Sequence, residues 1–79
     1  MKPEILEALA AHGVRPGDDT PLEVLRDQVR DLYLVEIRGL RDRCRAGDFP
    51  VTDLARRVIE LRRRYPILSI PIQRWVAPE

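Results

Sequence analysis

The chain has no proline between Pro21 and Pro50, an uninterrupted run that takes up about a third of its 79 residues. The run opens with TPLE, in which Thr20 can cap a helix, Pro21 suits the first helical position and Glu23 completes a capping box. Apolar residues then recur at the spacing of one helix face, and a glycine follows that can end the helix. The pattern predicts a helix over residues 21–46, roughly 39 Å long.

Two shorter helices are expected on either side of this long one. KPEILEALAAHG predicts a helix over residues 3–12, and VTDLARRVIELRRRY predicts another over residues 52–65. Because only a short turn joins the long helix to the last one, these two should form an antiparallel hairpin.

The C-terminal stretch cannot continue as regular helix, because Pro66, Pro71 and Pro78 interrupt it. We expect residues 66–79 to form an extended arm beyond a helical domain of residues 1–65. The predicted fold class is all-α, with a short N-terminal helix, a long antiparallel helical hairpin and an extended C-terminal arm.

Two charged residues fall within apolar helix faces. Glu36 lies in the middle of the apolar face of the long helix, and Arg62 lies within that of the third helix. In a hairpin that turns near Phe49 these two residues are opposite each other, as are Tyr33 and Tyr65. We therefore predict a Glu36–Arg62 ion pair that fixes the register and adds little net stability, because desolvation offsets the attraction. The alternative is a polar functional site between the helices.

The apolar surface exceeds what the hairpin alone can cover. Leu34 and Val35 project away from the main stripe, and the arm adds Ile70, Ile72 and Trp75. The arm either folds back over Leu34 and Val35 or crosses to another chain, and both remain open. A domain this small buries only about 60% of its unfolded surface, so association is a common supplement. These five residues are the predicted contact residues.

Together these features predict a small helical protein–protein interaction module. It would be a homo-oligomer, most simply a two-fold dimer, or an accessory or regulatory subunit of a larger assembly. The expected partners are a second copy of the chain and a larger protein. A lone cysteine, no recognisable signal peptide and no apolar stretch near the ~20 residues that span a bilayer predict a cytoplasmic protein without membrane contact.

An arginine-rich stretch supports an alternative function. Residues 49–79 carry a net charge of +3, although the whole chain carries only +1. The alternative is a nucleic-acid-binding regulator whose third helix contacts phosphates. The stretch TDLARRV resembles the opening helix of helix-turn-helix DNA-binding proteins, but the required turn and recognition helix do not follow. The candidate phosphate contacts are Arg56, Arg57, Arg63 and Arg64.

The residue types that carry catalysis are sparse. His12 and Cys44 are the only soft metal ligands and stand far apart, and the single serine, Ser69, lies in the apolar arm. There is no glycine-rich phosphate loop. We expect no catalytic residue, no metal and no cofactor, while a site shared between protomers stays open.

Overall fold

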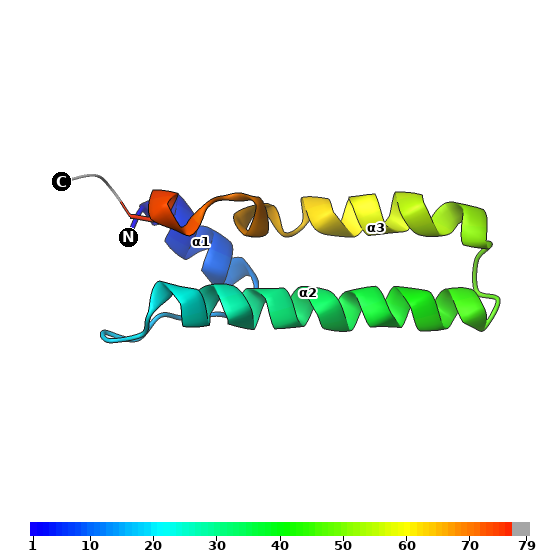
Figure 1. Ribbon diagram of the computed structural model, residues 1–79, viewed down its shortest axis with the longest axis horizontal. Helices are drawn as coiled ribbons and strands as arrows, with labels where there is room; N and C mark the ends of the chain where they lie inside the picture. Colours follow the sequence, from blue (N-terminus) through cyan, green and yellow to red (C-terminus); the bar gives the residue numbers. More distant parts are fainter. Residues whose placement is uncertain (77–79) are drawn as a thin grey trace.

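The computed structural model describes residues 1–76, and this part of the chain contains three α-helices and no strand. The longest helix and the last one run antiparallel as a hairpin in a molecule measuring 50 × 19 × 16 Å (Figure 1). Short 3-10 turns flank the last helix. The all-α class and the helical hairpin are thereby confirmed. In chain order the elements are α1 (Pro3–Ala11), α2 (Leu22–Arg45), η1 (Val51–Asp53), α3 (Leu54–Arg63), η2 (Pro66–Ser69) and η3 (Ile72–Arg74).

Glycines in left-handed backbone end the first two helices. Gly13 has a φ of 74° and Gly47 a φ of 85°, a region that other residues enter only at a cost. The N-terminal cap of α2 differs from expectation, because the helix begins one residue late and Pro21 takes the cap position. The Thr20 hydroxyl instead accepts a hydrogen bond from the Gly17 amide at 3.0 Å, which closes the preceding turn.

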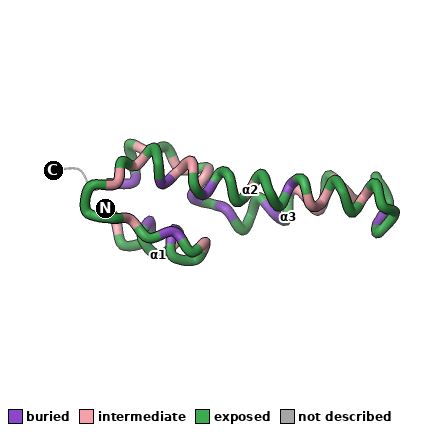
Figure 2. Tube along the Cα trace, turned by 90° about the horizontal axis from the view of Figure 1, so that it is seen from below, coloured by how far each residue is buried: buried purple, intermediate pink, exposed green. Residues whose placement is uncertain are grey.

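The hydrophobic core lies at one end of the molecule. It is built where α1, the first half of α2, the end of α3 and the C-terminal segment meet, and buried positions gather there (Figure 2). Burial of a large apolar side chain contributes about 1.5–3 kcal/mol, so this end supplies most of the hydrophobic stabilisation. The core side chains are Ile5, Leu9, Val14, Leu25, Val29, Ile37, Leu61, Tyr65, Ile67 and Trp75.

Residues 66–76 fold back onto their own chain. Ile67 and Trp75 are fully buried in the core. The indole nitrogen of Trp75 donates to the carbonyl of Ile70 at 3.1 Å, and the amide of Lys2 donates to the carbonyl of Trp75 at 3.0 Å. We call residues 66–76 the strap, because they join the end of α3 to the start of α1.

The strap is extended only in part, which refines the expected arm. Pro66 and Pro71 stand at the start of two 3-10 turns, where a missing amide hydrogen breaks no hydrogen bond. Ile70, between the turns, keeps extended backbone. The proposed boundary after residue 65 therefore does not separate two cores. Residues 77–79 of the expected arm lie outside the described residues.

Candidate functional site

Tyr65 lies where α1, α2 and the end of α3 meet. Its ring stacks on that of His12 with 4.1 Å between centroids and 9° between planes. It also meets Tyr33 edge-on at 5.4 Å. Its hydroxyl donates a hydrogen bond to Oε2 of Glu36. Burial, followed by this hydrogen bond and the nearby Glu36 charge, raises the pKa of Tyr65 to about 12, so the hydroxyl remains a donor at neutral pH.

Glu36 thus has a partner other than the one expected. The Tyr33–Tyr65 contact is found, so the hairpin register is close to the predicted one. The Glu36–Arg62 ion pair is not formed within residues 1–76. Arg62 instead lines an open pocket of about 270 Å³ beside both tyrosines and the strap residue Leu68. The reason is rotation, because Arg62 and Glu36 leave their helices toward opposite sides of the seam.

A small polar pocket of about 160 Å³ lies on the Glu36 side of this seam. Arg57 is held over the ring of Phe49 at 4.2 Å, and its Nε is buried without a hydrogen-bond partner among the described residues. The two acids are already engaged, Glu36 by a tyrosine hydroxyl and Glu60 by an arginine at 3.9 Å. The pocket is lined by Glu36, Leu40, Arg43, Arg57, Glu60, Leu61 and Arg64.

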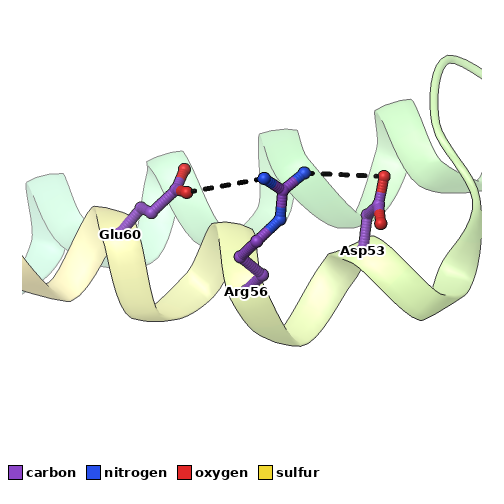
Figure 3. A network of polar contacts seen from close by, with 3 residues as sticks. All are labelled: Asp53, Arg56 and Glu60. Atoms are coloured by element: carbon purple, nitrogen blue, oxygen red, sulfur yellow. Dashed lines mark ion pairs between the residues drawn. The ribbon is translucent and has the colours of Figure 1, made fainter.

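The four candidate phosphate-binding arginines do not form one surface. Arg56 lies between Asp53 at 3.7 Å and Glu60 at 3.9 Å, so its charge is largely compensated (Figure 3). Arg63 lines a different pocket from Arg57 and Arg64. Only Arg57 and Arg64 share the polar pocket. Helix α3 therefore presents no continuous row of free arginines along one side.

The five predicted contact residues are also separated. Trp75 is enclosed in the core of its own chain, and Ile70 and Ile72 are half-buried against that core. Leu34 and Val35 remain uncovered, with 44% and 65% of their surfaces exposed. The strap covers the inner side of α2, so it does not reach them.

Leu34 and Val35 lie between two opposite charges on the outer side of α2. A shallow pocket of about 180 Å³ is lined by Asp31, Leu34, Val35 and Arg38. Asp31 comes three residues before Leu34, and Arg38 comes three residues after Val35. We call these four residues the α2 patch. The apolar pair was predicted as a contact and the two charges were not, although the spacing D-x-x-L-V-x-x-R is visible in the sequence.

Helix α3 also carries an exposed apolar residue. Ile59 is 52% exposed and lines a wide, open pocket of about 460 Å³ with Arg62, Arg63, Pro66 and Ser69. The sequence analysis did not name Ile59, because it falls outside the apolar stripe of its helix. A single exposed isoleucine beside two arginines is ordinary for a protein surface.

The described residues offer little for metal or redox chemistry. Within residues 1–76 no three His, Cys, Asp or Glu side chains gather as metal ligands would. Cys44 is a free, half-buried thiol in the hairpin, and His12 is stacked on Tyr65. No helix of this part of the chain is apolar enough over a sufficient length to cross a membrane. Comparisons with protein-family models, with curated proteins and with solved structures find no match.

Proposed function

We propose that the protein is a small helical protein–protein interaction module that self-associates through the outer side of α2. The observation that carries this proposal is the exposure of two adjacent apolar residues, Leu34 and Val35, on a helix that is already apolar on its inner side. A helix with apolar residues on both sides needs a cover on each. Residues 1–76 cover only one.

The shape of the molecule leaves further apolar residues partly exposed. Toward the turn of the hairpin, α2 and α3 lie against each other, and among the described elements only the short turn η1 joins them there (Figure 1). Leu40, Leu54 and Val58 are therefore only partly covered. Leu40 and Val58 pack toward the core on the inner side of the hairpin, so their exposure favours association in general and not a contact on the outer side of α2 in particular.

A second candidate function is nucleic-acid binding. The observation that favours it is the polar pocket, where Arg43, Arg57 and Arg64 line one hollow. A guanidinium group can donate two parallel hydrogen bonds to the oxygens of one phosphate. The net charge of +1 and the compensated Arg56 count against it. Phosphate binding should weaken steeply with salt, whereas an apolar contact should not.

The test is the native mass of the full chain, measured by light scattering over a range of concentrations, with and without nuclease and at low and high salt. We expect a small multiple of 9.2 kDa that is insensitive to nuclease. A monomer at every concentration would contradict self-association. A mass that falls on nuclease treatment would favour the second function, and a co-purifying polypeptide would indicate an accessory subunit.

A matched pair of variants locates the contact. Val35→Asp places a charge in the proposed contact and should shift the protein toward the monomer. Val51→Asp makes the same chemical change at the hairpin turn, where Val51 is 71% exposed, and should leave the mass unchanged. An equal effect of the two substitutions would contradict a contact at Leu34 and Val35.

A further inference from the structure

We infer that the α2 patch is occupied by the α2 patch of a second copy, with the two α2 helices antiparallel about a two-fold axis at the Leu34–Val35 peptide. This inference rests on the proposed self-association and specifies its geometry. The patch is self-complementary, because an acid and a base stand at equal distances on either side of the apolar pair. In a contact whose two-fold axis is perpendicular to the helices each patch meets itself in reverse, so this symmetry of charge is what such an interface requires.

The antiparallel arrangement follows from the charges of the patch. With the axis between Leu34 and Val35, Asp31 of one copy faces Arg38 of the other, and the pair occurs twice. Both side chains are exposed, and neither takes part in an ion pair within residues 1–76. They are therefore available to a second copy. A parallel pairing in register would place Asp31 against Asp31 and Arg38 against Arg38.

The charge along the whole helix favours the same direction. Residues 22–31 hold three acids and two arginines, a net charge of −1, whereas residues 38–45 hold four arginines and one acid, a net charge of +3. Antiparallel helices place the negative half of one copy beside the positive half of the other. Complementary potentials of this kind select the partner and the register of an interface.

On a helical wheel at about 100° per residue, Asp31 and Arg38 lie opposite the inner stripe, with Leu34 and Val35 on either flank. The two helices can therefore approach without moving α3 or the strap. One kind of unfavourable approach results and occurs twice by symmetry, because Asp27 of each copy would face Asp42 of the other. Asp27 is already paired with Arg30 of its own helix at 3.1 Å, which limits this repulsion.

The test reverses the two charges one at a time. In a dimer of the Asp31→Arg variant, the new arginine of each copy faces Arg38 of the other. In a dimer of the Arg38→Asp variant, the new aspartate of each copy faces Asp31 of the other. Each variant alone should lose at least about tenfold in dimer affinity, since like charges are opposed twice. An equimolar mixture of the two variants should associate again, because a mixed dimer restores both attractive pairs. The double variant Asp31→Arg/Arg38→Asp should also regain the wild-type mass.

Two charge reversals elsewhere serve as controls. Glu7→Arg on α1 and Arg63→Asp on α3 change exposed residues that lie outside the α2 patch. Both should keep the wild-type mass, which separates a local contact from an effect of net charge. Circular dichroism of all variants checks that each one is folded.

The outcomes separate the inference from the proposed function. If the wild type associates and the mixture of single variants restores the dimer, the antiparallel two-fold contact is supported. If the wild type associates but the single variants keep its mass, or their mixture stays monomeric, the inferred geometry is wrong while self-association stands. If the wild type is a monomer, or if its larger mass comes from a second polypeptide or from nucleic acid, the inferred contact and the proposed self-association are both overturned.

Discussion

At the scale of single residues, Tyr65 connects three parts of the chain through one ring and one hydroxyl. The ring is stacked on His12 at the end of α1 and touches Tyr33 of α2, while the hydroxyl reaches Glu36 one turn further along α2. A neutral donor to a carboxylate makes a stronger hydrogen bond than one between two neutral groups. Tyr65 is 5% exposed, whereas Glu36 is exposed, so water reaches the contact from the carboxylate side only.

Removing the Tyr65 hydroxyl should therefore cost more than removing another tyrosine hydroxyl. Tyr65→Phe is expected to lower the free energy of unfolding by about 1.5 kcal/mol, the lower end of the range for hydrogen bonds to charged groups, because the Glu36 carboxylate is exposed to water. The matched control is Tyr33→Phe, whose hydroxyl makes no hydrogen bond within the described residues. Urea denaturation measures both, and equal losses would contradict the role given to the hydroxyl.

The difference in stability between the wild type and Tyr65→Phe should depend on pH. The Tyr65 pKa is raised from 10.0 to about 12, so the folded protein holds this proton more tightly than the unfolded chain. Its contribution to stability is complete below pH 10 and is lost as the pH rises toward 12. Stability curves of the wild type and of Tyr65→Phe should therefore converge over that interval.

At the scale of elements, the hairpin depends on how α2 ends. Gly47 adopts a φ of 85° directly after the helix, and the turn to η1 begins there. Any side chain at this position is strained regardless of available space. Gly39, in the interior of α2, has ordinary helical backbone and nothing within 4 Å of an added Cβ.

Two alanine substitutions should thus have opposite effects. Gly47→Ala is expected to destabilise the protein by about 1–2 kcal/mol through left-handed strain. Gly39→Ala is expected to stabilise it by about 0.5–1 kcal/mol, because alanine favours a helix interior. Thermal unfolding followed by circular dichroism distinguishes the two signs. Destabilisation by both would mean that Gly39 serves a close contact, such as one with a second chain.

At the scale of the whole molecule, one core holds the two ends of the chain together and the strap completes it. Trp75 is fully enclosed although it lies near the C-terminus, in a segment with little regular structure. From the sequence, this tryptophan could anchor the arm on its own chain or on another, and its burial here makes it part of its own fold. Native proteins are stable by only about 5–15 kcal/mol, so one such side chain is a large share.

Truncation of this side chain should test the strap. Trp75→Ala is expected to cost about 3–5 kcal/mol, as large-to-small substitutions in cores do. Val76→Ala, at the next and exposed position, should change the free energy of unfolding by less than about 0.5 kcal/mol. Similar effects at both positions would mean that the strap is not docked in solution.

Features set by local interactions were predictable from the sequence, whereas features set by tertiary packing were not. The three helices were predictable within one or two residues, because proline, glycine and apolar spacing act locally. The Tyr33–Tyr65 contact was predictable because a short turn leaves few registers. The destination of the strap was not, because two prolines and isolated apolar residues carry no periodicity. The partner of Glu36 was missed because it depends on helix rotation, and the α2 patch because it depends on which side of α2 stays uncovered.

The amide of Lys2 bonded to the carbonyl of Trp75 has a further consequence for spectroscopy of this protein. Trp75 is the single tryptophan of the chain, and it lies at the joint between the first and last described segments. Its fluorescence therefore reports whether that joint is closed, whereas the far-ultraviolet circular dichroism is dominated by α2 and α3, which continue from the core to the far end of the molecule (Figure 1). Coincident unfolding curves from the two signals would describe one cooperative unit. Separate curves would mean that the helical hairpin stays folded after the contact between the strap and the start of α1 has opened.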